Sequence, residues 1–360
     1  CGAAIAFFLV PLHVGCKSRP YRTFFWFVFP SAVAMLWFIA FPLVSVIVQS
    51  LHVAHGQVLI VSENCGPFGC TESTSVDVEA TALLKDAAPL GRFNGLGTYF
   101  DRGHLATAEI AVAWSGTDGW SEFFSKVMNL PFYKALAFTI AYTAVVTPLV
   151  ILLGLAVALG VNGLPKLLKG PTIFISLLPM IVTPLIGSLI LYWMIDADGI
   201  LGKGLQYIFD DAALSLKASR LLTWLTLFTY GIWHGIPFAF VVFYAGLQTV
   251  PEETLEAAMI DGASRWERIR YVVIPYMGPL FVFVALIQLM DNFRVFEPII
   301  GFSAQANASS LSTEIYGDLL GDNAQYASAA ATSMLTVIGV AILLTPVLIR
   351  TWRDFNRKAV

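Results

Sequence analysis

The sequence predicts an all-α, polytopic membrane helical bundle from its composition, its apolar blocks and the charges that flank them. The chain of 360 residues is 57% hydrophobic and only 12% charged. Its mean hydropathy of +0.74 is far above that of a soluble domain. Apolar blocks long enough to cross about 30 Å of hydrocarbon must be helical, because lipid offers no partner to a free backbone amide or carbonyl. We identify six such blocks: Phe24–Ser50, Phe132–Val161, Thr172–Ile195, Leu221–Gln248, Ile274–Phe302 and Tyr326–Ile349.

Lysines and arginines cluster at those ends of the apolar blocks that would lie on the same side of a membrane. Lys and Arg are retained on the cytoplasmic side during insertion, so both ends of the six-span core and residues 249–275 are expected in the cytoplasm. The connectors 196–217 and 303–325 then lie outside, although the first contains Lys203 and Lys217. The net charge of -3 is too small to argue for a nucleic acid partner. The basic flanks are Lys17, Arg19, Arg22, Lys166, Lys169, Arg265, Arg268, Arg270, Arg350, Arg353, Arg357 and Lys358.

The blocks divide the chain into five parts. We expect an N-terminal apolar segment with its basic flank (1–23), a first core span (24–50), a small extracytoplasmic lobe (51–131), a five-span core (132–350) and a cytoplasmic tail (351–360).

Residues 1–16 are mostly apolar but too short to span comfortably, and the basic cluster follows them, against the order of a signal peptide. We interpret them as the remnant of an additional span, in which Cys1 and Cys16 are ordinary apolar residues. In the lobe, Cys65 and Cys70 form CGPFGC, which predicts either a disulfide or two free thiols.

Motifs of catalytic chemistry are missing from the sequence. There is no HExxH and no GxSxG with triad partners, and Gly202–Lys203 lacks the flanking residues of a phosphate-binding loop. The chain is therefore expected not to be an enzyme and not to bind ATP itself. A membrane enzyme acting on a lipid-linked sugar would need an acid and a base, for which Asp196 and Asp198 are the only candidates.

Polar residues interrupt the fifth block, where each charge costs about 3 kcal/mol. Some pairs are three or four residues apart and can share one helical face. One interpretation is an internal ion pair near the outer interface, and another is the polar lining of a solute path. A third is a proton relay in a secondary transporter, using Asp291, Arg294 and Glu297. The interrupting residues are Gln288, Asp291, Asn292, Arg294 and Glu297.

The third and fourth blocks are interrupted too. Pro179 and Pro184 predict a kinked helix whose freed carbonyls face the interior. In the fourth block, small residues favour close helix packing, while a tryptophan can stack on a sugar ring or fill the bundle. These residues are Gly231, Trp233, His234, Gly235 and Pro237.

Residues 249–275 predict two short helices joined at a corner. Thr249 with Glu252, and Ser264 with Glu267, have the spacing of capping boxes. Gly262 lies between them, where a helix end commonly needs a positive φ. The segment is either a simple connector or a functional element.

This segment, YAGLQTVPEETLEAAMIDGASRWERIRYVVIP, closely resembles the EAA loop of ABC-importer permeases, with Val272 where many members carry Ile. FNGLGTYFD, NLPFYKALAFT, GIWHGIPF and DNFRVFEPI resemble the carbohydrate-importer branch of that family. The resemblance covers residues 24–355 in family order.

The resemblance implies a coupling mechanism. In that family the EAA helix fits a cleft on a separate cytoplasmic ATPase dimer, which carries ATP and Mg, and an extracytoplasmic binding protein delivers the solute to two permease subunits. This chain is then a permease of a bacterial-type inner membrane, in contact with lipid and without a cofactor of its own. Its coupling helix is expected at about Glu252–Asp261, with ATPase-coupling residues Glu256, Ala257, Ala258, Asp261, Gly262 and Ala263.

The enlarged outer lobe and the extra N-terminal segment make the chain similar to the maltose-type first permease of a heterodimer. The implied solute is an oligosaccharide, α-glucoside-like, or a related polyol. Gln288 and Met180 differ from the maltose permease and the lobe is far smaller, so the resemblance implies no particular sugar. The polar interruptions and the family positions together predict a substrate path of Met180, Gly231, Gly235, Gln288, Asp291 and Asn292.

Overall fold

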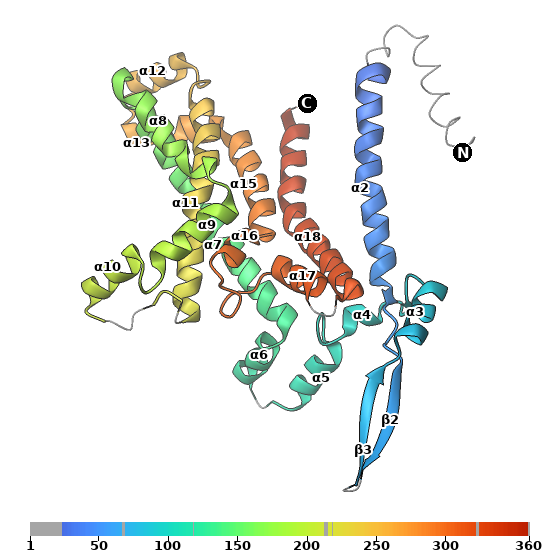
Figure 1. The fold of residues 1–360 in the computed structure, drawn as a ribbon. Coiled ribbons are helices and arrows are strands. Elements are labelled where there is room, and N and C mark those ends of the chain that lie inside the picture. Colours follow the sequence, from blue (N-terminus) through green and yellow to red (C-terminus); the bar gives the residue numbers. More distant parts are fainter. Residues whose placement is uncertain are drawn as a thin grey trace. The chain divides into compact units, whose positions relative to one another are not determined.

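The protein is a helical membrane bundle with a small β-containing lobe (Figure 1). The computed structural model describes residues 24–66, 69–117, 119–211, 215–217, 219–321 and 324–358. The predictions for residues 1–23, among them the span remnant with Cys1 and Cys16, lie outside the described residues. The chain forms two compact units, residues 1–98 and 99–360.

Four described helices are long and apolar enough to cross a membrane, and two bent helix pairs bring the number to six if each pair is one span. These are the six positions that the apolar blocks predict. The helices of the spans are α2 (Phe29–Ser50, after η2, Phe24–Val28), α7 (Pro131–Asn162), α8 (Lys166–Ile181) with α9 (Pro184–Ile195), α11 (Arg220–Leu247), α13 to α15 (Arg265–Arg268, then η3, Ile269–Val273, α14, Ile274–Tyr276, and α15, Gly278–Phe293) and α18 (Tyr326–Lys358).

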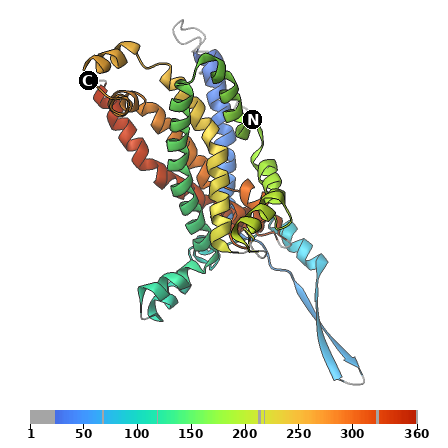
Figure 2. The same ribbon diagram turned by 90° about the vertical axis from the view of Figure 1, so that its left-hand side faces the viewer.

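The first unit contains α2 and two antiparallel strand pairs. Strands β2 (Leu59–Gly66) and β3 (Gly69–Val76) form a long ribbon (Figure 2). Their register places Cys65 opposite Cys70. The side chains of both cysteines lie outside the described part of the structure, so the disulfide stays a prediction. Strand β1 (His52–Val53) pairs with β4 (Arg92–Phe93). The unit also contains α3 (Val78–Ala87) and the start of α4 (Gly97–Phe100).

Helices α7 and α11 pack along each other and form the centre of the second unit (Figures 1 and 2). Phe138, Phe240 and Phe243 are fully buried between these helices and their neighbours. The backbones approach closely at Gly154, where an added Cβ would lie 2.5 Å from the Cβ of Ala239. The small residues therefore set the α7–α11 distance.

We expect Gly154→Ala to lower the thermal midpoint of the purified protein in detergent by several degrees, because overpacking a close contact costs about 1–3 kcal/mol. Gly160→Ala is the matched control on the same helix, since nothing lies within 4 Å of its added Cβ. Its midpoint should be unchanged or slightly higher, because Ala favours helices over Gly by about 1 kcal/mol. Equal midpoints for the two variants would contradict the close contact.

The third span is bent by 93° between α8 and α9. Val182 and Thr183 are extended there, because a residue that precedes proline disfavours the helical region. The predicted kink is therefore confirmed at Pro184, and the continuous block Thr172–Ile195 is wrong as a single helix. Pro179 remains inside α8 and is buried.

The fifth span also differs from the predicted block Ile274–Phe302. It bends by 70° near Met277 and its helix ends at Phe293, with Arg294 as the C-terminal cap. A separate short helix, α16 (Glu297–Gly301), packs against α9. The charged residues Asp291, Arg294 and Glu297 lie at this break, but in the sequence they predicted a polar helical face and not a helix end.

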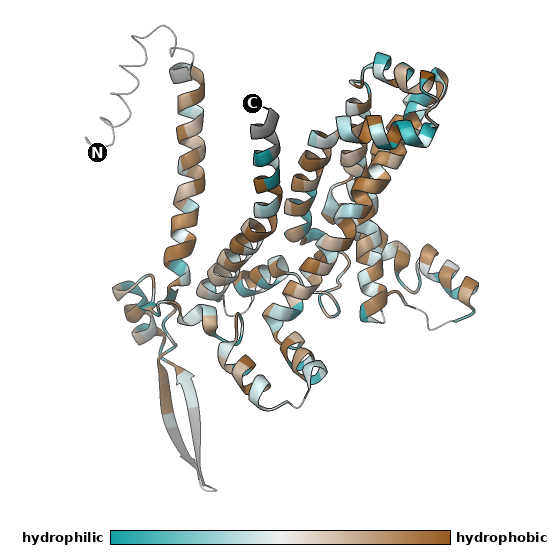
Figure 3. Ribbon diagram, turned by 180° about the vertical axis from the view of Figure 1, so that it is seen from behind, coloured by the Kyte–Doolittle hydropathy of each residue, from teal (hydrophilic) through white to brown (hydrophobic). Residues whose placement is uncertain are grey.

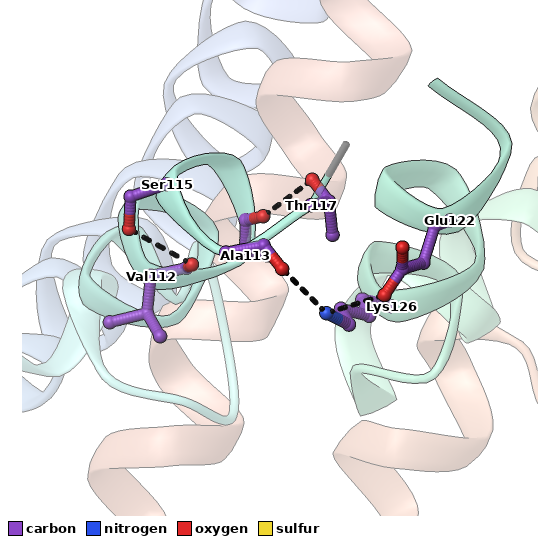
Figure 4. A network of polar contacts seen from close by, with 7 residues as sticks. Val112, Ala113, Ser115, Thr117, Glu122 and Lys126 are labelled. Atoms are coloured by element: carbon purple, nitrogen blue, oxygen red, sulfur yellow. Dashed lines mark hydrogen bonds and ion pairs between the residues drawn. The ribbon is translucent and has the colours of Figure 1, made fainter. Parts of the chain in front are cut away.

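The α5–α6 hairpin (α5, Thr107–Ser115; α6, Trp120–Met128) precedes α7 and is tied together by polar contacts (Figure 4). Lys126 donates to the carbonyl of Gly116 at 3.3 Å and pairs with Glu122 at 2.9 Å. The hairpin belongs to the second unit, which begins at residue 99. The predicted lobe of residues 51–131 is therefore divided between the two units.

The two connectors that the sequence predicts to lie outside contain short helices. In α17 (Leu311–Leu320), Asp318 accepts from Ser328 Oγ at 2.6 Å. The buried His104 has its Nε2 3.1 Å from the Ser328 carbonyl. These contacts tie the loop before α5 to the start of α18. The other connector contains α10 (Ile200–Phe209).

Candidate functional site

An open cavity of about 560 Å³ lies among α7, α8, α9, α11, α15 and α16. Figure 1 shows these helices meeting in the middle of the second unit. All six residues predicted for the substrate path line this cavity, although they come from three different spans. Their role in transport stays a prediction. The lining residues are Tyr142, Met180, Pro184, Tyr230, Gly231, His234, Gly235, Phe238, Ile287, Gln288, Asp291, Asn292, Arg294, Val295, Glu297 and Pro298.

Two buried amide side chains, those of Gln288 and Asn292, form part of the cavity wall. Asn292 donates from Nδ2 to Thr147 Oγ1 at 2.9 Å and to Gln288 Oε1 at 3.3 Å. The predicted shared face of Gln288 and Asn292 is therefore confirmed. Amides can donate to and accept from hydroxyl groups, and the contact with α7 holds Asn292 in place.

Charged groups lie at the more exposed end of the cavity. Arg294 donates to Asp291 at 3.0 Å, so the predicted pairing of these two residues is confirmed. Glu297, the first residue of α16, lines the same cavity. The ion pair and the polar lining, which were alternatives in the sequence, coexist in the structure.

The backbone break between α8 and α9 faces α11. Tyr230 donates its hydroxyl to the Pro184 carbonyl at 2.7 Å, and His234 Nε2 lies 3.4 Å from the Val182 carbonyl. The ring of Tyr230 stacks on that of His234 at 5.8 Å. The carbonyls at the break therefore face the interior, as the proline pair predicts, and side chains of α11 satisfy them.

Gly231 and Gly235 let neighbouring side chains reach the cavity wall. An added Cβ at Gly231 would lie 2.1 Å from the Tyr142 hydroxyl, and one at Gly235 would lie 2.9 Å from Val150 and 3.4 Å from Gln288 Oε1. The close-packing interpretation of these glycines is confirmed. They also line the cavity, so packing and solute contact do not exclude each other.

Sequence reasoning did not select Tyr142, Tyr230 or Phe238, which also line the cavity. An aromatic residue inside an apolar block is indistinguishable by pattern from a core residue. The sequence signal came from the polar interruptions of α15 and from the glycine and proline interruptions of the third and fourth blocks.

The loop between α11 and α15 is exposed and well ordered by its own hydrogen bonds. Helix α12 (Glu252–Ile260) and α13 meet at a corner, as predicted. Gly262 has φ +80°; its N–H donates to Met259 at 3.1 Å, and that of Ala263 donates to Ala258 at 2.9 Å. This is a Schellman cap, which requires the positive φ that glycine supplies.

The Ser264–Glu267 capping box is confirmed, with both reciprocal hydrogen bonds. The Thr249–Glu252 box is wrong. Thr249 instead donates to the Gly246 carbonyl at 2.8 Å, and the N-cap position of α12 is Pro251, two residues later, without a side-chain cap. The Thr249 hydroxyl therefore donates to a carbonyl in the last turn of α11 and does not accept from a backbone N–H of α12.

Glu256 is exposed on α12, while its neighbour Leu255 packs on the hydrophobic core. Ile260 is 87% and Trp266 76% exposed. Hydrophilic residues gather at this end of the bundle (Figure 3). The loop thus presents a rigid, mixed surface with large apolar side chains, which is typical of a docking site.

The outer carboxylates considered for acid–base catalysis are separately held by lysines. Asp196 lies 3.5 Å from Lys217, and Asp198 lies 3.8 Å from Lys203. Each carboxylate therefore faces a cation and not the other carboxylate. Within the described part of the chain, no group of three or more His, Cys, Asp or Glu residues is arranged to hold a metal ion.

Several relatives of the chain are named as sugar permeases. The chain is 30% identical over 190 residues to the trehalose transport system permease protein SugA of Mycobacterium tuberculosis, covering 52% of this chain and 60% of that protein. It is 28% identical over 273 residues to the galactooligosaccharides transport system permease protein GanP of Bacillus subtilis, covering 73% and 65%. The chain thus spans less than two thirds of the length of these relatives.

A solved structure has the same fold. The chain matches the crystal structure of a bacterial ABC transporter involved in the import of the acidic polysaccharide alginate, with a TM-score of 0.55 and 20% identity over 77% of this chain and 97% of that one. Residues 150–352, from the middle of α7 through most of α18, match the family of binding-protein-dependent transport system inner membrane components. Since that match includes the cavity helices and the capped loop and covers more than half of the sequence, the chain belongs to this family.

Proposed function

We propose that this chain is the membrane-spanning permease subunit of an ATP-driven importer of an oligosaccharide or a related polyol. The observation that carries the proposal is the convergence of the predicted path residues on one cavity. Its wall offers amides, tyrosines and two carboxylates, which can hydrogen-bond sugar hydroxyls, together with the aromatic face of Phe238.

The partners follow from the surfaces of the chain. The cavity is not fully enclosed by this chain, which suits a second permease subunit that completes the path. The exposed α12–α13 corner suits a cytoplasmic ATPase dimer, which would bind ATP and Mg, because this loop is held by internal caps and can transmit movement to α11 and α15. An extracytoplasmic binding protein would deliver the solute from the outer side.

We further propose that Cys65 and Cys70 form a disulfide across the β2–β3 ribbon. Directly opposed residues of an antiparallel pair have Cα atoms about 4.5–5.5 Å apart, within the range of disulfides. Reaction of both thiols with maleimide before reduction would contradict the bond.

The energy source tests the importer proposal. Proteoliposomes that contain the chain with its second permease and ATPase should take up trehalose or galacto-oligosaccharide only with ATP and the binding protein. The chain alone should not transport under a pH gradient. Uptake by the chain alone, driven by the gradient and indifferent to ATP, would instead support the proton-coupled transporter that uses Asp291, Arg294 and Glu297.

A further inference from the structure

The charged groups on the cavity wall do not balance. Two carboxylates, Asp291 and Glu297, face the cavity with one guanidinium, that of Arg294. Arg294 is held by Asp291 at 3.0 Å, so this cation is already matched by an anion. The remaining lining side chains are amides, tyrosines, His234 and apolar groups, so with the histidine neutral the wall is negative.

Glu297 is the source of this imbalance. Among the residues that the structure describes, Glu297 forms no ion pair with a lysine or arginine. Glu297 lines the cavity together with Tyr142 and Tyr230, so its carboxylate belongs to the same wall as these aromatic side chains. The backbone of Glu297 contacts α9, because the Ser188 hydroxyl donates to the Glu297 carbonyl at 3.4 Å.

We propose that Glu297 is a specificity-determining residue that restricts this path to saccharides without acidic groups. A carboxylate accepts hydrogen bonds from sugar hydroxyls and attracts an amino group, but it repels a uronate, sulfate or phosphate. The repulsion acts in a partly enclosed cavity, where solvent screens charges less than in bulk water. Arg294 does not offset this repulsion, since its guanidinium is already paired with the Asp291 carboxylate. This inference rests on the proposed function, because it takes the cavity as the solute path.

The local potential can be measured without knowing the natural solute. Met180 lines the cavity and its side chain is 56% exposed, so Met180→Cys places a thiol there. The full chain is treated with a cationic and an anionic methanethiosulfonate reagent, and labelling of the native cysteines is subtracted with the parent chain. Tyr207→Cys on α10, 90% exposed and outside the cavity, gives the reference ratio of the two rates.

We expect the ratio of cationic to anionic rates to be higher at position 180 than at position 207. Glu297→Gln should lower the ratio at position 180 about fivefold, because removal of one nearby charge changes the two rates in opposite directions. Glu297→Asp keeps the charge and should keep the ratio. This control shows whether the effect of Glu297→Gln comes from the lost charge or from misfolding. Asp198→Asn removes a carboxylate outside the cavity and should also keep it. A ratio at position 180 that Glu297→Gln leaves within about twofold would overturn the proposal.

Protection by sugars tests the substrate class directly. Labelling of Met180→Cys by a neutral reagent should be slowed by high millimolar trehalose but not by a disaccharide that carries one glucuronate, and Glu297→Gln should allow both to protect. Equal protection by both sugars in the chain with Glu297 would refute the charge selectivity and leave the importer proposal standing. Protection by neither sugar would refute the cavity as a saccharide site, and with it the basis of the importer proposal.

Discussion

Glu256→Lys is expected to reduce ATP-driven solute uptake by at least about tenfold while the transporter still assembles. Glu256 is exposed on α12, so the substitution costs the fold little. In the proposed function α12 docks on the ATPase, and a like-charge contact in a docking site costs several kcal/mol, where 1.4 kcal/mol is a factor of ten. The Schellman cap at Gly262 and the Ser264 box keep the shape of the loop, so the other contacts with the ATPase persist.

Uptake in proteoliposomes and co-purification of the ATPase measure the two parts of this prediction. Glu122→Lys makes the same charge reversal on α6, outside the coupling loop, and should leave uptake near the wild-type level. Intact uptake in Glu256→Lys would show that Glu256 does not couple the chain to the ATPase. Loss of the ATPase from the purified complex would show that Glu256 is needed for assembly and not for coupling alone.

Asn292→Leu is expected to have the second largest effect, an approximately tenfold loss of uptake. The substitution removes a buried amide from the cavity wall and leaves Gln288 Oε1 without its donor. An unpaired buried polar group costs about 1–3 kcal/mol, and the solute loses a hydrogen-bonding partner as well. The apparent affinity for the solute should fall more than the thermal midpoint of the protein.

Thr147→Val separates solute contact from positioning of the amide. This nearly isosteric change removes the Thr147 hydroxyl that accepts from Asn292 at 2.9 Å, while both amides stay in the cavity wall. Thr147 does not line the cavity, so uptake should fall much less than in Asn292→Leu. Equal losses in the two variants would mean that Asn292 supports the α7–α15 contact and does not bind solute.

The accuracy of the sequence predictions depended on the range of the interaction. Gly262 was predicted correctly because a helix end of this geometry requires a positive φ whatever surrounds it. Ser264 and Glu267 complete their capping box within three residues. The capping box predicted at Thr249 does not form, because the Thr249 hydroxyl donates to a carbonyl at the end of α11.

Hydropathy located the spans but could not locate their breaks. The positions of Pro179 and Pro184 predicted a kink, and only Pro184 makes one, since Pro179 stays within α8. The end of α15 at Phe293 was not predicted, because the charged residues around it indicate a polar face as readily as a helix end. A break of this kind depends on what packs against the freed backbone, and α9 and α11 supply those partners.

The sequence by itself determined the class of the protein, the position of its spans, the helix–corner–helix loop and the polar face of α15, because hydrophobic length, charge asymmetry and capping are local properties. Only the tertiary structure decided that Met180, Gly231 and Gln288 surround one cavity and that Glu297 lines it without an ion pair to any described lysine or arginine. Asn292 and Thr147 are separated by 145 residues, and their hydrogen bond exists because α7 and α15 pack side by side. Such contacts depend on how side chains of distant helices fit together, which hydrophobic length and capping in a single segment do not encode.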